Sequence, residues 1–447
     1  MAKKKQIELT IEEKLQNALV PKEEQPYKIP SNWCWLYSNF VVDVRDGTHD
    51  TPKYISEGYP LITSKNLKNN NIDFDKVNYI SKEDYEKINL RSKVDIGDVL
   101  FSMIGTIGNP VLIKGQTNYA IKNVALFKDI NLINMTFFRF YLETKFVIDK
   151  MKKEAKGSTQ KFVSLKYLRN FPICYPSLEE QQRIVNRIES LFTKLDRAKE
   201  LIENTLAQFE QNKMAILHKA FTGELTVKWR KENNINEKNF FNKVKLKNVI
   251  KLISGRDVSV SLCNDKSIGI PYILGASNIK DNKFFIERWI ENPVVVSEKN
   301  DILLSVKGTI GKLYLQKEEK INISRQIMAL RALNELNTHY LYYFLLRECE
   351  RLKFEGNGLI PGISRKDILD LNILLPTIEE QQEIVNILDN LLAKYNKIKN
   401  LEQQLEKIEL LKKAILAKAF RGELGTNNPD EESAENLLKE ILAEKII

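Results

Sequence analysis

The sequence has few of the residues that most enzyme and membrane sites require. Its four cysteines are scattered without a CxxC pair, which indicates neither a disulfide framework nor a zinc site. Three isolated histidines leave no evident metal site or nucleophile–base pair. No apolar run approaches about 18 residues, and the opening MAKKKQIELTIEEK lacks the apolar centre of a signal peptide. We therefore expect a soluble, cytoplasmic protein that does not bind a membrane.

Catalytic motifs are missing as well. No Pro-Pro pair occurs anywhere in the 447 residues, whereas an adenine methyltransferase needs an Asp/Asn-Pro-Pro-aromatic motif. Two GTIG segments, at 105–108 and 308–311, do not fit the phosphate-binding pattern GxxxxGK[ST] and lie between expected strands, so we expect tight turns there. The sequence thus predicts no catalytic residue, no metal ligand and no cofactor for this chain.

Positive charge is in excess. The net charge is +10 and the pI is about 9.0. The last 23 residues, from Gly425, carry six acids and two lysines, a net of −4, so the remainder holds +10 + 4 = +14. Such a balance suits a polyanionic partner, although lysine-rich compositions also arise simply as solubilising surfaces.

The strongest pattern is a stretch that occurs twice. Residues 176–225 begin PSLEEQQRIV and end KAFTGEL, and residues 376–424 begin PTIEEQQEIV and end KAFRGEL. The offset between the copies is 200 at the start and 199 at the end, so the second copy has lost one residue. An opening proline, two glutamates in the first turn and a late glycine are typical of one helix. About 42 helical residues would make a rod of roughly 60 Å.

Apolar residues in both copies recur in steps of three and four, close to the period of a coiled coil. A long apolar stripe is not stable alone in water, and the twin helix is its obvious partner. We expect the helix to absorb the lost residue near 398–401. The expected seam residues are Ile184, Ile188, Leu191, Leu195 and Ile202 in the first copy, and Ile384, Leu388, Leu391, Tyr395 and Leu401 in the second.

The segments that precede the two long helices share one plan. YILGASNIKDNKFF (272–285) parallels LITSKNLKNNNIDF (61–74), and INISRQIMAL (321–330) parallels NYAIKNVALF (118–127). These parallels predict an α+β protein in which two α/β domains are separated by a long antiparallel two-helix coiled coil, a tandem duplication with pseudo-two-fold symmetry. The expected divisions are an N-terminal helical arm (1–24), a first domain (25–175), a first long helix (176–225), a linker (226–242), a second domain (243–375), a second long helix (376–424) and an acidic tail (425–447).

The EEQQ openings, the KAFxGEL endings, LTVKWRKEN after the first long helix and the GTIG turns resemble the DNA-specificity subunits of type I restriction–modification systems. The resemblance covers essentially the whole chain. It implies a non-catalytic subunit whose two target-recognition domains each read one half of a bipartite, asymmetric double-stranded DNA sequence. It also implies that the helices dock two DNA-adenine methyltransferase subunits and that a restriction/translocase subunit joins the complex. S-adenosylmethionine, ATP and magnesium would then bind to the partner subunits.

The expected DNA-binding residues lie in polar segments next to expected strands. RDGTHDTPKY (45–54) is the best single candidate, because recognition residues normally lie in loops on a rigid scaffold. Asn suits adenine, whereas Lys and Arg suit guanine or phosphate. The candidates in the first domain are Arg45, Thr48, His49, Thr51, Lys53, Tyr54, Lys65, Asn66, Lys68, Lys122, Asn123, Lys161 and Lys166. The candidates in the second domain are Arg256, Ser277, Asn278, Lys280, Lys307, Arg325, Gln326, Arg365 and Lys366.

Three alternatives remain open at this point. Each candidate residue could simply belong to a solvated loop or strand face. The chain could be a self-contained DNA methyltransferase or endonuclease, which the missing motifs disfavour. It could also be a coiled-coil interaction protein without DNA affinity.

Overall fold

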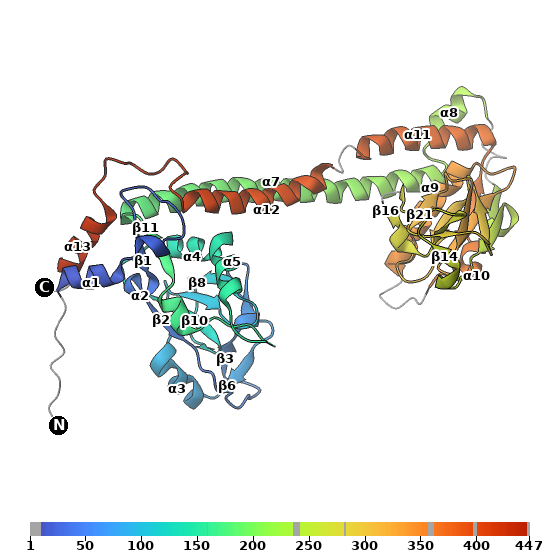
Figure 1. Cartoon of the computed structure of the whole chain (residues 1–447). Coiled ribbons are helices and arrows are strands. Elements are labelled where there is room, and N and C mark those ends of the chain that lie inside the picture. The colour runs from blue at the N-terminus through green and yellow to red at the C-terminus, as the bar shows by residue number, and fades with distance from the viewer. Residues whose placement is uncertain are drawn as a thin grey trace. The chain divides into compact units, whose positions relative to one another are not determined.

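The computed structural model describes residues 10–158, 160–235, 242–280, 283–355, 362–396 and 400–444. The chain divides into two compact units, one made of Met1–Leu201 with Gln404–Ile447 and the other of Ile202–Gln403. Helix α7 (Leu178–Thr222) contributes to both units (Figure 1). In the described ranges, no helix is long and apolar enough to cross a membrane.

The globular domain of the first unit contains an antiparallel sheet with the strand order β2-β10-β7-β8. Of its inner strands, β7 is fully buried and β10 is buried over its first four residues, whereas β2 alternates between buried and half-buried residues, as expected for an edge strand. A smaller sheet, β6-β3-β9, pairs β3 and β9 in parallel. The strands are β1 (Cys34–Tyr37), β2 (Val42–Asp46), β3 (Tyr59–Ile62), β4 (Leu67–Lys68), β5 (Asn71–Ile72), β6 (Asn78–Ile80), β7 (Val99–Ser102), β8 (Gly108–Leu112), β9 (Ala120–Ile121), β10 (Val124–Asp129) and β11 (Pro172–Tyr175).

The helices of this domain begin where the sequence supplies a cap. Ser81, Asn134 and Thr144 accept hydrogen bonds from backbone N–H groups of the first turns of α3, α4 and α5. These caps satisfy donors that have no partner inside the helix. The helices are α2 (Ser38–Val41), α3 (Lys82–Ser92), α4 (Met135–Glu143), α5 (Lys145–Glu154) and α6 (Leu165–Arg169).

The domain of the second unit repeats this topology. Its main sheet has the order β13-β23-β20-β21, and β15 and β22 form the parallel pair that corresponds to β3 and β9. The strands are β12 (Asn242–Lys245), β13 (Ile250–Ser254), β14 (Cys263–Asn264), β15 (Ile270–Ile273), β16 (Ile279–Lys280), β17 (Lys283–Phe284), β18 (Trp289–Ile290), β19 (Val296–Glu298), β20 (Ile302–Ser305), β21 (Leu313–Leu315), β22 (Lys320–Ile323), β23 (Ile327–Ala332) and β24 (Asn372–Leu375). The helices are α9 (Thr338–Glu355) and α10 (Arg365–Leu369), and α8 (Val227–Glu232) lies in the expected linker.

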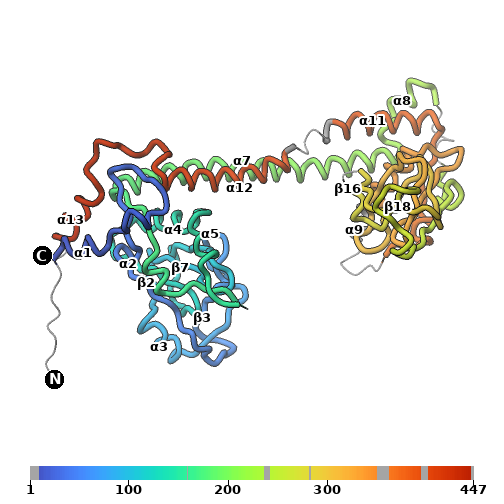
Figure 2. The backbone as a smooth tube through the Cα atoms, viewed as in Figure 1, coloured from blue at the N-terminus to red at the C-terminus, as the bar shows by residue number. Residues whose placement is uncertain are grey.

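The second copy of the long stretch is described as two helices, α11 (Ile378–Asn396) and α12 (Asn400–Ala419). Residues 397–399, in the region where we expected the helix to absorb the lost residue, lie outside the described part. In the first unit α12 runs antiparallel along α7 (Figure 2), since Asp196 pairs with Lys412 (2.5 Å) and Lys199 pairs with Glu409 (3.1 Å). In the second unit, apolar residues near the end of α7 share a core with residues of α11.

The seam residues differ in burial along the helices. Ile184, Ile188, Ile384 and Leu388 are fully buried, and each lies near the start of its helix, where the globular domain adds further contacts. Further along, the helices are covered on fewer sides. Half-buried there are Leu191, Leu195, Ile202, Leu391 and Leu401, whereas the side chain of Tyr395 lies outside the description.

The EEQQ segments join each long helix to its own domain. Gln181 accepts the backbone N–H of Asn134 (2.8 Å), and Gln182 accepts the side-chain amide of the same asparagine (2.9 Å). Gln381 and Gln382 make the same two bonds to Asn337, at 2.7 Å and 3.0 Å. Asn134 directly precedes α4, and Asn337 directly precedes α9. The EEQQ motif therefore fixes the angle between each long helix and the domain to which it is bonded.

The second glutamate of each EEQQ segment is buried and contacts the far end of the other copy. Thr426 donates its hydroxyl hydrogen to Glu180 (2.6 Å), and Thr226 donates its own to Glu380 (2.5 Å). The compensating arginine differs between the two sites, which we call the glutamate nodes. It is Arg183, three residues after Glu180, in the first node and Arg230, on α8, in the second. Burial, the largest cause, raises the pKa of Glu180 above its usual range.

The acidic tail folds back onto the N-terminal arm. Helix α13 (Ala434–Glu444) packs against α1 (Ile11–Ala18), with Leu438 and Leu15 buried in the core of the first unit. Glu431 in the connecting segment pairs with Arg183 (2.6 Å).

We predict that Arg230→Ala destabilises the second unit strongly. The Arg230 side chain is 4% exposed and Glu380 is fully buried, so its removal leaves a buried carboxylate without its counter-ion, at a cost of about 3–5 kcal/mol. Calorimetry of the full chain should show that the thermal transition of the second unit occurs at a clearly lower temperature. Lys228→Ala, on the same helix but 91% exposed, is the matched control and should leave that transition unchanged. Equal shifts for the two variants would contradict this account of the node.

Candidate nucleic-acid interface

A polar corner forms in the first domain where β9 ends and β10 begins. The corner consists of Lys122 and Asn123, and Asn123 adopts a positive φ of 56°. The segment after β2, residues 47–51, lies beside it and is called the first loop below. Thr48 donates its N–H to Ile121 (3.0 Å) and accepts the N–H of Asn123 (3.1 Å). These two bonds hold the backbone of the loop against the corner.

The second domain builds the same feature with one more residue. There the corner is Ser324-Arg325-Gln326, between β22 and β23, and the first loop is 255–258. Arg256 donates its N–H to Ile323 (3.0 Å), just as Thr48 does to Ile121. The first residues of the two corners correspond, because the backbone N–H groups of Lys122 and Ser324 donate to the carbonyls at equivalent ends of β3 and β15. The sequence alignment matched Lys122 with Arg325; the hydrogen bonds correct this and make Arg325 the additional residue.

Both first loops need their glycine because of a close backbone approach. A Cβ atom on Gly47 would lie 2.3 Å from the carbonyl oxygen of Ile121, and one on Gly255 would lie 2.1 Å from that of Ser324. Gly47 and Gly255 also donate their N–H groups to the first residues of β10 and β23, at 3.0 Å and 3.1 Å. Only glycine lets the loop lie this close to the corner.

Other loops converge on the same edge of the second domain. Gln326 accepts the N–H of Val306 (2.8 Å), and its side-chain oxygen lies next to Gly275 and Gly308. Ile363 donates its N–H to Val306 (2.9 Å), which brings in the segment before α10. The structure therefore brings Arg256, Arg325, Gln326 and Lys307 together on neighbouring turns. In the first domain the bond that matches Ile363–Val306 runs from Val163 to Met103 (2.9 Å), and Gly105 also donates its N–H to Lys161 (2.8 Å).

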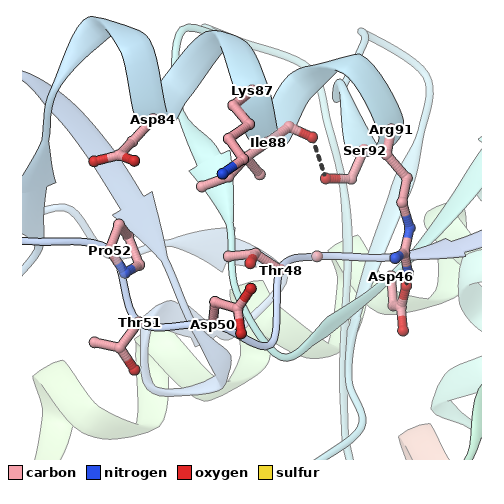
Figure 3. Close-up of a pocket in the computed structure, with 11 residues that line it drawn as sticks. Asp46, Thr48, Asp50, Thr51, Pro52, Asp84, Lys87, Ile88, Arg91 and Ser92 are labelled. Carbon is pink, nitrogen blue, oxygen red and sulfur yellow. Dashed lines mark hydrogen bonds and ion pairs between the residues drawn. The ribbon is translucent and has the colours of Figure 1, made fainter.

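A chain of charged and polar groups supports the first-domain corner from behind. His49 lies within hydrogen-bond distance of Asn123 and of the buried Asp46, 3.0 Å from each, and Arg91 on α3 pairs with the other Asp46 oxygen. Lys122 donates to the hydroxyl of Thr51. The loop and α3 line an open cleft of about 340 Å³, to which Lys87 and Arg91 contribute (Figure 3).

The corresponding contact in the second domain is ionic. Asp257, which follows Gly255 by two residues as His49 follows Gly47, accepts the backbone N–H of Arg325 (3.1 Å) and forms an ion pair with its guanidinium, in which Nε lies 2.7 Å from a carboxylate oxygen. Val258 donates its N–H to the Tyr272 hydroxyl (3.2 Å), and burial raises the pKa of Tyr272, so this hydroxyl remains neutral. The loop residue two positions after the glycine thus orients a corner side chain in both domains.

Two predicted base contacts are corrected by the structure. Asn66 is 5% exposed and Asn278 is fully buried. Each uses its side-chain oxygen to accept backbone N–H groups at the start of its turn and its NH₂ group to donate to the backbone carbonyl seven residues on. Their amides hold a turn after β3 and β15, so we exclude both residues from the interface.

Three arginine and lysine candidates are also used inside their domains. Arg365 donates to the hydroxyl of Ser254 (2.7 Å) and the carbonyl of Leu252 (3.2 Å), and Arg45 pairs with Asp43 (2.7 Å). Lys68 pairs with Asp73 (2.7 Å). The remaining exposed candidates that stay in the expected interface are Lys53, Tyr54, Lys65, Lys161, Lys166, Ser277, Lys280 and Lys366.

Asp46, Arg91 and Asp257 were missed by sequence reasoning. Their importance depends on partners 3 to 68 residues away, which are brought together only by the fold. One signal was available for Asp257, because it stands two residues after the glycine of the loop that matches RDGTHD.

Two domains of one topology, each with a polar corner and joined by one long helix, define the class as a tandem-repeat recognition protein. The chain belongs to the family described as the type I restriction modification DNA specificity domain, whose model matches residues 47–208 and 239–410, more than half of the chain. It is a specificity subunit, a non-catalytic component of a type I restriction–modification system.

Relatives and solved structures agree with this family. The putative MjaX specificity subunit of Methanocaldococcus jannaschii is 25% identical over 89% of this chain and 95% of its own. The EcoKI specificity subunit of Escherichia coli is 23% identical over 94% and 96%. A specificity subunit from Thermoanaerobacter tengcongensis superposes with a TM-score of 0.53 at 21% identity, covering 90% of this chain and 99% of that one. A chain from a study of type I complex assembly gives 0.73 at 22% identity, covering 89% and 100%.

We predict that Asn278→Ala lowers the stability of the second domain by about 1–3 kcal/mol, because buried backbone donors would lose their acceptor. Ser277→Ala, at the neighbouring exposed position, should change the free energy of unfolding by less than about 0.5 kcal/mol. Urea unfolding of the full chain, followed by tryptophan fluorescence, to which Trp289 in this domain contributes, measures both. An Asn278→Ala variant as stable as the parent would restore this residue as a base-contact candidate.

Proposed function

We propose that this chain binds double-stranded DNA and reads a bipartite, asymmetric target, with one domain for each half-site. The observation that carries the proposal is that the same corner and first loop recur on two matching scaffolds with different side chains. The first corner offers Lys122 and Asn123 beside His49, whereas the second offers Arg325 and Gln326 beside Asp257. Two readers that share a backbone but not their side chains suit a target with two unlike halves.

The long helices are suited to set the distance between two readers. With 45 residues, α7 spans roughly 68 Å, which exceeds the 34–36 Å of about one DNA turn between half-sites. The tandem duplication supports opposite orientations of the two domains on the duplex, with pseudo-two-fold symmetry. We place the first domain at 25–175 and the second at 243–375.

The helices also offer a surface for partner subunits. In the first unit, Leu201 is 59% exposed, Leu410 is 63% exposed and Leu411 is 49% exposed. Apolar residues on a helix pair that is covered on one side suit the docking of further helices. We assign this surface to the DNA-adenine methyltransferase subunits, two per complex. S-adenosylmethionine, ATP and magnesium would bind to these partner subunits or to the restriction/translocase subunit, and not to this chain.

We predict that exchanging residues 25–175 for the matching domain of a related subunit alters one half-site only. The scaffold of the second domain does not depend on these residues, because its core lies within its own unit. Methylome sequencing of cells that carry the system measures the recognised sequence before and after the exchange. A change in both half-sites would refute one domain per half-site.

We also predict steep salt dependence for DNA binding by the purified chain. Six or more lysine and arginine contacts to phosphates would reduce affinity roughly a thousandfold between 50 and 200 mM salt. A salt-titrated gel shift with duplexes that do and do not carry the methylated sequence measures this. Retention of no duplex at low salt would favour an interaction protein, and methyl transfer from labelled S-adenosylmethionine by the chain alone would indicate a self-contained enzyme.

A further inference from the structure

We propose that Arg325 reads a guanine in the half-site of the second domain and that Asp257 is the positioning residue that aims it. This inference rests on the proposed function, because it assigns a base and two roles within the same interface. The observation behind it is that the second corner is one residue longer than the first and that the additional residue is Arg325.

Arg325 has no part in the sheet on either side of it. Its N–H bonds to Asp257, whereas the N–H groups of Ser324 and Ile327 bond to backbone carbonyls that define the ends of β22 and β23. The Arg325 side chain is 68% exposed. An exposed ion pair of this kind contributes only about 0–1 kcal/mol to stability, so the fold gains little from it.

The geometry of the pair suits base reading. Asp257 accepts the Arg325 backbone N–H through Oδ1, and its Oδ2 lies 2.7 Å from Nε, so one carboxylate contacts both the backbone and the guanidinium of Arg325. Within the described residues the two terminal nitrogens, Nη1 and Nη2, donate no hydrogen bond. Those two groups form the fork that matches O6 and N7 of guanine in the major groove. Because its rotamer is already selected, the guanidinium loses less entropy when it binds.

The first domain uses the equivalent loop position differently. His49 holds Asn123, an amide, and no cation occupies an inserted position there. The Arg325–Asp257 pair therefore belongs to one half-site, and its removal should affect that half-site alone. A phosphate-binding arginine would instead change affinity for every sequence alike.

The test selects bound duplexes from a pool with randomised positions, using the full chain assembled with its methyltransferase subunits. The parent should select guanine at one position of the second half-site. Arg325→Ala should remove that preference, and Asp257→Asn should weaken it about tenfold, with the first half-site unchanged. The guanine preference of the double variant should match that of Arg325→Ala within about twofold. Asp257 acts through Arg325, so replacing Asp257 has no further effect once Arg325 is absent.

Glu319→Gln is the matched control. It removes another exposed ion pair of the same domain, Lys299–Glu319, also at 2.7 Å. Its base preferences should equal those of the parent, and thermal unfolding should show all variants folded. The inference fails if Arg325→Ala or Asp257→Asn weakens all sequences equally, or if the guanine preference survives them. A parent complex that selects no bipartite sequence would instead overturn the proposed function.

Discussion

Two buried glutamates determine how this molecule is put together. Each stands at the start of one long stretch and accepts a hydroxyl hydrogen from a threonine that follows the end of the other. A buried carboxylate is stable only when it is paired and hydrogen-bonded, so each start requires the opposite end to be in place. The glutamines beside them fasten the same helix turns to a recognition domain. Rod pairing and domain orientation thus depend on one four-residue motif.

Much of this architecture could be predicted from the sequence, because it follows from periodicity and repetition. Ile184, Ile188, Ile384 and Leu388 recur at coiled-coil spacing, and the structure buries them. The repeat of strands and turns also survives in the fold, down to matching sheet orders. The α+β class and the family were accessible for the same reason, since these features are local in the chain.

The recognition surface was less predictable, because its geometry depends on partners distant in sequence. Asn66 and Asn278 look like loop residues in the sequence, yet the turn closes over them and uses their amides as backbone caps. Arg365 looks like a phosphate contact but supports strand β13. Conversely, an acidic residue such as Asp257 is not expected near a polyanion, and only its hydrogen bond and ion pair with Arg325 indicate a role for it. A sequence shows which side chains are polar, whereas the fold determines which of them already form hydrogen bonds or ion pairs within the protein.

Both arginines of the glutamate nodes lie in the first half of the chain, so the two halves are not interchangeable when their genes recombine. Arg183 lies on the first rod and Arg230 follows it, whereas Glu383 stands at the position that matches Arg183 and residues 425–447 contain no arginine. A gene that joined two first halves would encode two arginines for every buried carboxylate. A gene that joined two second halves would encode none, and each of its buried carboxylates would face additional negative charge. The charges of the two nodes therefore favour a first half in any pairing of the halves, because only the first half carries the arginines.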